Sequence, residues 1–257
     1  MTAALGRDLL VGLDLAWSTG WTGVAVVDAT GRLLDSGRVR TDDEIAAWLG
    51  SLPGHPQVVA VDAPLVVPND TGQRAAERQI GAAYGPFGSS AHSANRTLLR
   101  GQPRAMRLAE RFGWSIDPSH RPSDDATACI EVYPHPALVG LFRLPYRLAY
   151  KKGSADQRLT GFRRLADLLE SIGELDLTSH PRWARIRETL ASPRRGDLTR
   201  HEDEVDAVVC AHLAWLWQHH PEALQVYGSL ADGYIVAPPP PSHPAVRPRP
   251  ATTTRPR

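Results

Sequence analysis

The sequence predicts an α/β fold in which a mixed β-sheet is flanked by helices, and three observations favour it. Two short apolar runs, at residues 9–16 and 58–64, have the composition and length of buried strands. The first run continues into two further strand patterns joined by short turns, which is typical of an antiparallel meander. Amphipathic helices follow in the second half of the chain, most clearly at residues 155–172.

The composition of the 257 residues suits one large domain, or a domain that carries an insertion. The net charge of +1 gives no global basic field that would indicate nucleic acid, although a local basic patch is compatible with it. Cys129 and Cys210 lie in apolar surroundings and predict free thiols in a reducing compartment. Because no signal-peptide pattern opens the chain and no apolar run reaches about 18 residues, we expect a cytoplasmic protein without a membrane span. The sequence leaves the oligomeric state open.

The first part of the chain predicts a strand meander followed by a crossover. Thr41 and Glu44 fit a capping box that opens a helix at residues 42–49, and the next strand ends at Asp62. Because a helix precedes that strand, we expect it to run parallel to the first strand, which ends near Asp14. The two aspartates then emerge at the same carboxyl edge, where open α/β sheets bind ligands. The three meander strands are expected at residues 9–16, 21–29 and 33–39.

Residues 66–125 are rich in Gly, Ser, Pro, Asn and Arg and show little strand periodicity. We interpret them as an insertion or lid packed over the carboxyl edge, with a helix near residues 73–80. If residues 104–112 are helical, Arg107 and Arg111 share one face. The alternative interpretation is a solvated, Arg-rich face.

The second half predicts one more central strand and then mainly helices. Residues 238–257 are rich in Pro and Arg and lack core-forming side chains, so we expect a disordered tail. The predicted organisation is one domain at residues 1–237, with its insertion at about 66–125, followed by that tail. Strands are expected at residues 126–132 and 234–236, and helices at residues 137–142, 155–172, 181–191 and 202–219.

Acidic residues end or interrupt the predicted buried elements. Asp14 and Asp62 end strands, Glu131 lies inside one, and Asp203 and Asp206 share a face near the start of the last predicted helix. The helix dipole explains acids in a first turn, but Asp206 lies a turn further in. Each acid alone is compatible with a structural carboxylate that caps a turn. Together they predict a cation site, and its oxygen ligands favour Mg²⁺ or Mn²⁺.

Several motifs, taken in chain order, resemble a known family. They are Gly12-Leu13-Asp14-Leu15-Ala16, Ala60-Val61-Asp62-Ala63-Pro64, Glu131-Val132-Tyr133-Pro134 with His135-Pro136, Tyr150-Lys151-Lys152-Gly153, and Gly233-Tyr234-Ile235-Val236-Ala237-Pro238. Over residues 9–238 this set resembles the DUF429 group, which is described as predicted nucleases. The order of the elements and the late Asp203-Glu204-Val205-Asp206-Ala207 motif resemble the ribonuclease H-like superfamily and the closing helix of its Holliday-junction resolvases. The resemblance implies a ribonuclease H-like fold with metal ligands at Asp14, Asp62, Asp203 and Asp206, and Glu131 as a further candidate.

These features predict a divalent-metal-dependent nuclease or phosphodiesterase that hydrolyses nucleic acid. Two ions about 3.5–4 Å apart, bridged by Asp14, would activate a water and stabilise the leaving oxygen. Asp62 and Asp206 would complete the metal shell, and Asp203 would bind directly or through water. His135 or His201 would shuttle a proton, unless His135 is only a packed turn residue. Lys151 and Lys152, the only lysines among the 29 basic residues, would hold a phosphate or merely lie in an exposed turn.

Two other functions remain open at this point. An actin-like-ATPase-type phosphotransferase is suggested by Ser18-Thr19-Gly20 and Thr22-Gly23, which resemble its first phosphate loop. Against it, no Gly-Gly nucleotide-binding segment occurs late in the chain, and 257 residues is short for two such lobes. A non-catalytic binding protein on the same fold would use the carboxylates structurally.

Overall fold

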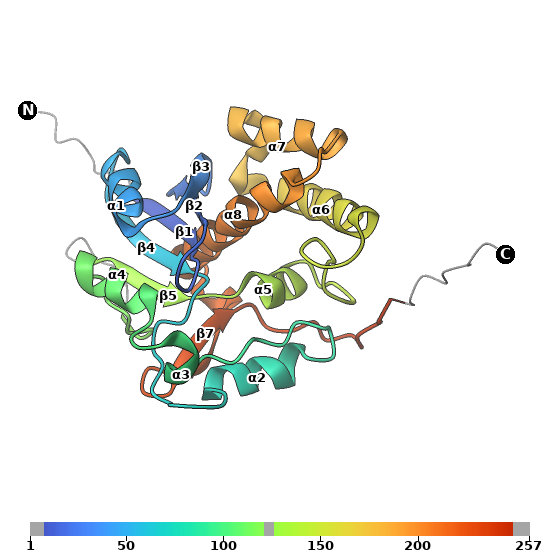
Figure 1. The fold of residues 1–257 in the computed structure, drawn as a ribbon. Coiled ribbons are helices and arrows are strands. Elements are labelled where there is room, and N and C mark those ends of the chain that lie inside the picture. Colours follow the sequence, from blue (N-terminus) through green and yellow to red (C-terminus); the bar gives the residue numbers. More distant parts are fainter. Residues whose placement is uncertain (1–7, 121–125, 249–257) are drawn as a thin grey trace, which may run out of the picture.

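The computed structural model describes residues 8–120 and 126–248, and a five-stranded sheet lies at its centre (Figure 1). The strand order is β3-β2-β1-β4-β5, with β2 antiparallel to both β1 and β3, and β4 parallel to both β1 and β5. The strands are β1 (Leu9–Asp14), β2 (Thr22–Asp28), β3 (Leu33–Val39), β4 (Pro56–Val61) and β5 (Ala128–Glu131). The predicted α/β class and the mixed sheet are confirmed.

Helices cover the sheet and carry the remaining core. The eight α-helices of the described residues are α1 (Asp42–Gly50), α2 (Ala75–Tyr84), α3 (Arg96–Leu99), α4 (Arg104–Phe112), α5 (Pro134–Leu141), α6 (Ala155–Glu170), α7 (Pro181–Ala191) and α8 (Asp197–His219). The long α8 packs directly across β1 and β2 (Figure 1). Its buried side chains, which include Val205, Val208 and Leu213, join the apolar strand residues in one large core. Each such side chain contributes about 1.5–3 kcal/mol when fully buried.

Local signals set several of these boundaries as expected. The capping box forms before α1, where the Glu44 amide donates to Thr41 Oγ1 over 3.1 Å and the Glu44 carboxylate in turn accepts from the Thr41 amide. The meander strand β3 and helix α7 occupy the predicted residues. Cys129 and Cys210 are buried free thiols.

The start of the last helix differs from the prediction. We expected it near Glu202, but α8 begins at Asp197 after Gly196. Its first turns are mostly polar, so the apolar periodicity that marked the helix in the sequence becomes visible only at Val205. Asp203 and Asp206 therefore lie in the second and third turns, and the helix dipole does not account for them.

The start of α5 also differs, because this helix begins at Pro134 and not at residue 137. A proline is well accommodated in the first turn of a helix, where its missing N–H is not needed. The strand predicted for residues 126–132 is shorter, at Ala128–Glu131, and part of the loop before it, residues 121–125, lies outside the described residues.

A second, smaller core lies beside the sheet. It forms between α2 and a hairpin of β6 (Gln225–Ser229) and β7 (Gly233–Ala237), which lie side by side at the bottom of Figure 1. The hairpin touches the main sheet through a parallel bridge between Val132 and Val236. The described part of the predicted insertion, residues 66–120, holds α2, α3 and α4.

The tail is ordered further than predicted. Residues 238–248 follow the second core: the Pro238 carbonyl accepts from Tyr84, and the Val246 amide donates to the Pro145 carbonyl over 2.8 Å. Because prolines lack amide donors, this segment forms neither a helix nor a strand. The proline carbonyls can still accept hydrogen bonds, and these hold the segment against the core. The expectation of disorder from residue 238 was therefore wrong for this segment, and residues 249–257 lie outside the described part of the chain.

Candidate metal centre

Three carboxylates from distant parts of the chain meet at the carboxyl edge of the sheet. Asp14 ends β1, Asp62 directly follows β4, and Asp206 lies in α8. Each offers an oxygen atom, and these atoms lie within 4.8 Å of one another. The amide of Asp62 donates to the Leu13 carbonyl over 2.8 Å, which extends the parallel pairing of the strands as far as the site. The shared edge that the sequence predicted for Asp14 and Asp62 is present.

Two glycines allow α8 to approach the sheet closely enough to deliver Asp206. A Cβ atom on Gly12 would lie 2.1 Å from the Ala207 carbonyl oxygen, and one on Gly23 would lie 1.7 Å from the Asp203 carbonyl oxygen. Either contact is far inside van der Waals distance, so the backbone of α8 lies directly on β1 and β2 only because these positions lack a side chain. Without this approach Asp206 would not reach Asp14.

A lysine and a tyrosine from one loop complete the cluster. Lys151 Nζ forms an ion pair with Asp206 Oδ2 and lies 3.7 Å from Asp14 Oδ2. The Tyr150 hydroxyl donates to Asp206 Oδ1 over 2.8 Å. Asp206 and Tyr150 are fully buried. The carboxylate of Asp206 is therefore held in one orientation by two neighbours, as a preorganised ligand must be.

Burial and mutual repulsion raise the pKa values of two of the acids in this cluster. Burial, with the charges of Asp206 and Glu131, raises the pKa of Asp62 to about 7 against the opposing charge of Lys151. Burial also raises the pKa of Asp14 well above its ordinary value, again against the opposing charge of Lys151. Several carboxylates in one desolvated place are stable as anions only beside positive charge. Lys151 supplies one positive charge, fewer than the number of carboxylates.

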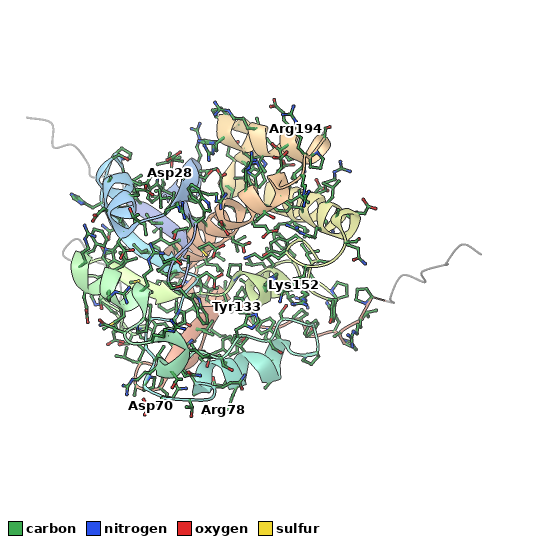
Figure 2. The ribbon with its side chains drawn as sticks, viewed as in Figure 1. Asp28, Asp70, Arg78, Tyr133, Lys152 and Arg194 are labelled. Atoms are coloured by element: carbon green, nitrogen blue, oxygen red, sulfur yellow. The ribbon has the colours of Figure 1, made fainter. Side chains whose placement is uncertain are left out.

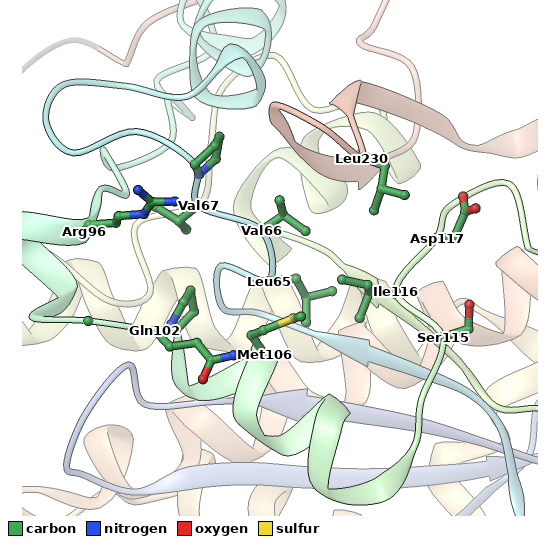
Figure 3. A pocket seen from close by; sticks show the side chains of 13 residues that line it. Leu65, Val66, Val67, Arg96, Gln102, Met106, Ser115, Ile116, Asp117 and Leu230 are labelled. Atoms are coloured by element: carbon green, nitrogen blue, oxygen red, sulfur yellow. The ribbon is translucent and has the colours of Figure 1, made fainter.

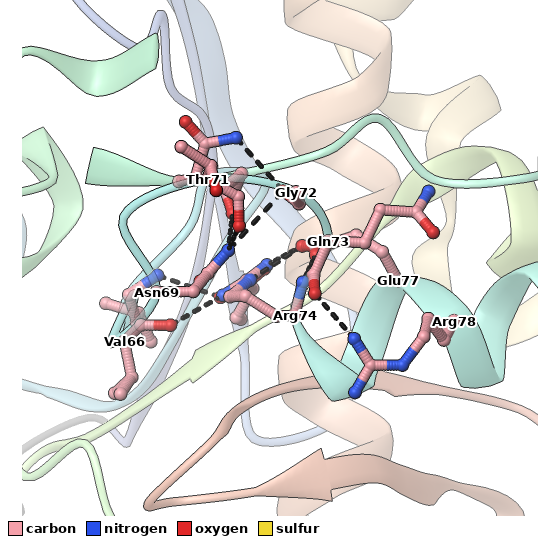
Figure 4. A network of polar contacts seen from close by, with 12 residues as sticks. Val66, Asn69, Thr71, Gly72, Gln73, Arg74, Glu77 and Arg78 are labelled. Atoms are coloured by element: carbon pink, nitrogen blue, oxygen red, sulfur yellow. Dashed lines mark hydrogen bonds and ion pairs between the residues drawn. The ribbon is translucent and has the colours of Figure 1, made fainter. Parts of the chain in front are cut away.

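Glu131 was a further candidate ligand, but its carboxylate binds an arginine outside the cluster. Its two oxygens accept from Arg74, at 2.9 Å from Nη1 and 2.5 Å from Nη2, and one of them also accepts from the Leu65 amide over 2.8 Å. The same guanidinium binds Glu77, with Nε 2.6 Å from Oε1, and donates to the Val66 carbonyl (Figure 4). Both oxygens of Glu131 are thus engaged by the segment that leads into α2. Glu131 is not part of the three-carboxylate cluster.

Asp203 is also separated from the cluster by an arginine. Its Oδ2 lies 2.8 Å from Arg38 Nη2, and the three grouped carboxylates do not include it. Burial raises the pKa of Asp203, and the charge of Arg38 opposes that effect. Of the four predicted metal ligands, the structure therefore brings three together and leaves Asp203 paired at the margin.

The predicted proton carriers differ in position. The ring of His135 lies 5.1 Å from that of Tyr150, and burial lowers the pKa of His135 to about 4, so it is neutral near pH 7. His201 lies beside Glu204 instead, with 3.5 Å between Nδ1 and Oε2. Of the two, only His135 adjoins the carboxylates through Tyr150.

Lys152 lies beside the cluster and not in it. It is exposed, and it lines a cavity of about 160 Å³ together with Lys151, His135, Tyr146 and Arg147. Figure 2 labels Lys152 near α5. This cavity is basic, which suits an anionic group next to the carboxylates.

Three residues of the site were missed by reasoning from the sequence. Tyr150 orients Asp206, while Arg38 and Arg74 withdraw Asp203 and Glu131 from the cluster. Tyr150 stands beside the unusual lysine pair, which was the one available signal for it. The two arginines had none, because nothing local distinguishes them from the other arginines of the chain.

A larger cavity, of about 790 Å³, lies elsewhere (Figure 3). Its walls are mainly apolar and include Leu65, Met106 and Ile116, while its charged side chains Arg96 and Asp117 lie at opposite ends of the view. It contains none of the three clustered carboxylates. Because the perturbed acids and the basic side chains gather at the sheet edge, we place the functional site there.

The donor set at the sheet edge fits a hard divalent cation, since every offered ligand is a carboxylate oxygen and positive charge is in deficit. Fold and site together define an α/β protein with a partly buried carboxylate cluster at the carboxyl edge of its sheet. A family model described as a protein of unknown function (DUF429) matches residues 12–230, so the chain belongs to the DUF429 family. No curated protein and no solved structure matches it. Within the described residues, no helix has the length and apolar character needed to cross a membrane.

Proposed function

We propose that this protein is a divalent-metal-dependent hydrolase that cleaves phosphodiester bonds in nucleic acid and is built on a ribonuclease H-like fold. The observation that carries the proposal is the convergence of Asp14, Asp62 and Asp206 oxygens within 4.8 Å. The order of elements supports the fold assignment: a strand with an acid, a hairpin, a helix, a parallel strand with an acid, and a late helix that supplies the third acid.

In this proposal Asp14, Asp62 and Asp206 hold Mg²⁺ or Mn²⁺. When bound, the metal would supply Lewis-acid chemistry, lowering the pKa of water and neutralising charge on phosphate oxygens. Tyr150 keeps the Asp206 carboxylate oriented toward its partners. His135 is neutral near pH 7, but because burial lowers its pKa to about 4 it is a weak base there, and its role as a proton carrier stays a prediction. Lys151 provides a mobile positive charge beside the carboxylates that suits a phosphate oxygen.

The decisive experiment compares Asp14→Asn with the unchanged protein in Mn²⁺-dependent cleavage of single-stranded and branched nucleic acid. Because a metal supplies several kcal/mol of charge stabilisation, loss of this ligand should lower the rate by about 100-fold or more. Asp70→Asn is the matched control, since the Asp70 side chain is 81% exposed, pairs with Arg96 and does not belong to the three-carboxylate cluster. Cleavage that persists unchanged in Asp14→Asn would exclude the proposed mechanism.

The phosphotransferase alternative has its own test. Ser18 and Thr19 line a cavity of about 600 Å³ beside Arg40 and Arg107, which is the observation that favours it. Binding of ATP at this place would raise the melting temperature of the protein. An unchanged melting temperature at millimolar ATP would count against it.

A further inference from the structure

The turn between β1 and β2 carries two exposed indoles next to the carboxylates. Trp17 is 39% exposed and Trp21 is 46% exposed. The turn begins directly after Asp14, the last residue of β1. A tryptophan offers a large apolar ring with a low entropic cost of ordering, and exposed tryptophans are enriched where proteins bind partners.

Both indoles are placed by contacts that reach the site. The guanidinium carbons of Arg38 and Arg40 lie 4.6 and 5.3 Å from the Trp21 ring centroid, and Arg38 is itself anchored by Asp203. Trp17 lines a small cavity together with Asp62, one of the three clustered carboxylates. The same cavity is lined by Tyr133 and His92, so aromatic and imidazole rings surround this approach to the cluster.

Two acids on this side form ion pairs, and Arg40 does not. Asp42 Oδ1 lies 2.7 Å from Arg104 Nε, and Asp43 Oδ1 lies 2.9 Å from Arg111 Nη2. Among the residues that the structure describes, the guanidinium of Arg40 forms no ion pair with a carboxylate. Its charge also attracts the nearby Glu44, but from beyond ion-pair distance. The guanidinium of Arg40, beside an exposed ring, is therefore available to a phosphate of a bound strand.

A second cavity beside the cluster is basic. Arg147 and Lys152 line the 160 Å³ cavity that also contains Lys151, and neither pairs with a described carboxylate. Asp62 lines the cavity on the tryptophan side and Lys151 lines the basic one, so the two cavities adjoin the same carboxylate cluster. A chain of phosphates passing the cluster would meet positive charge at Arg40, beside Trp21, and at this cavity.

We propose that the substrate of this site, resting on the function proposed above, is a single strand of nucleic acid whose bases stack on Trp17 and Trp21. Its phosphates contact Arg40 beside Trp21, and Arg147 and Lys152 at the basic cavity. Base faces are free in a single strand, whereas in a duplex they are covered by the neighbouring base pairs. Stacking on indoles tolerates any base, so recognition here is independent of sequence.

Binding can be measured apart from cleavage. In EDTA, the fluorescence anisotropy of labelled oligo(dT) and oligo(U) of about 20 nucleotides reports affinity for single strands, and a duplex of the same length reports affinity for paired strands. We expect tighter binding of a single strand than of the duplex. Because stacking on one aromatic ring is equivalent to about 5- to 150-fold in affinity, Trp17→Ala with Trp21→Ala should weaken single-strand binding by at least about 10-fold.

Matched variants separate stacking from charge and from misfolding. Trp17→Phe with Trp21→Phe keeps two rings and should retain most of the affinity, while Leu98→Ala removes an exposed apolar side chain elsewhere and should change nothing. Arg147→Gln with Lys152→Gln should reduce the slope of log affinity against log salt by about 0.7 for each phosphate that is no longer neutralised. Unchanged circular dichroism shows that each variant is folded.

The outcomes distinguish this inference from the proposed function. Equal binding of single strand and duplex, or full affinity in the double alanine variant, would overturn the inference, and so would binding of an apolar peptide but of neither oligonucleotide. Tryptophan-dependent binding of the strand without any Mn²⁺-dependent cleavage would support the inference and contradict the hydrolase. Mn²⁺-dependent cleavage that is unchanged in the double alanine variant would support the hydrolase and contradict the inference.

Discussion

Lys151 is the residue on which the charge state of the carboxylate cluster depends. Its ammonium group pairs with Asp206 and lies 3.7 Å from Asp14, and it comes from a loop and not from a helix or strand of the core. Since lysine is a compact charge on a flexible stem, it can leave the carboxylates without unfolding the sheet. It would therefore compete with the proposed metal ion for the same oxygens.

Lys151→Met is expected to raise the affinity for Mn²⁺ by about 10-fold or more, because the competing charge is removed while all three carboxylates stay. Isothermal titration with Mn²⁺ measures the change. Lys152→Met is the matched control and should alter the affinity by less than about 3-fold, since Lys152 forms no ion pair with a described carboxylate. Equal or weaker Mn²⁺ binding in Lys151→Met would show that the lysine does not occupy the metal position.

His212 gives the protein a predictable acid sensitivity away from the site. Burial among apolar neighbours, including Trp215, lowers the pKa of His212 to about 4 from its ordinary value of 6.5. Between these two values the unfolded chain takes up a proton and the folded chain does not. The stability contribution is therefore complete above pH 6.5 and is lost as the pH falls toward 4.

At pH 4.5 this loss amounts to about 2–3 kcal/mol relative to pH 7.5. We expect His212→Leu to remove it, so that the difference in unfolding free energy between the two pH values becomes smaller by that amount in urea titrations. His55→Gln, at an exposed position, is the control and should leave the difference unchanged. If His212→Leu and the unchanged protein show the same difference in unfolding free energy between the two pH values, His212 is not the source of the acid sensitivity.

At the scale of elements, the contact between α8 and the meander decides whether a site exists. Apolar periodicity predicted that a helix would form here, but its distance from β1 depends on the missing side chains of Gly12 and Gly23. The five-residue error in its start shows the limit of periodicity, since polar turns of a helix carry no apolar stripe.

Gly12→Ala should destabilise the protein by at least about 3 kcal/mol, because its Cβ would meet the backbone of α8 at Ala207 and Ala211. Gly81→Ala is the matched control: it lies in α2, where an added methyl group would have no atom within 4 Å, and should stabilise the helix by about 0.5–1 kcal/mol. Chemical denaturation of both variants measures the difference. A loss below about 1 kcal/mol in Gly12→Ala would mean that α8 can move away from the sheet at little cost.

At the scale of the whole molecule, the proposed metal would connect elements from both ends of the described chain. Asp14 belongs to the first strand, Asp62 follows the fourth strand, and Asp206 belongs to the last long helix. An ion held by all three binds only the folded arrangement, so its binding free energy adds to the stability of the fold.

Mn²⁺ at about 100 times its dissociation constant should raise the unfolding free energy by about 2.7 kcal/mol, equivalent to a melting temperature about 5–10 °C higher. Asp206→Asn should lose this shift while keeping an oxygen to accept from Tyr150, and Asp70→Asn should retain it. Scanning calorimetry with Mn²⁺ and with EDTA measures both. A shift of equal size in Asp206→Asn would place the bound ion elsewhere.

Local signals in the sequence determined the secondary structure and the edge at which two acids meet. Strand length, the capping box at Thr41 and the parallel crossover are properties of neighbouring residues, so they were readable without the fold. The predicted parallel pairing also placed Asp14 and Asp62 at one edge of the sheet, since parallel strands end on the same side.

Only the tertiary structure decided which acids belong together. Asp206 joins the cluster because α8 lies against Gly12, whereas Asp203 and Glu131 are withdrawn by Arg38 and Arg74. Those arginines come from β3 and from the loop before α2, and whether a charge finds a partner depends on distance through space and not on position in the chain.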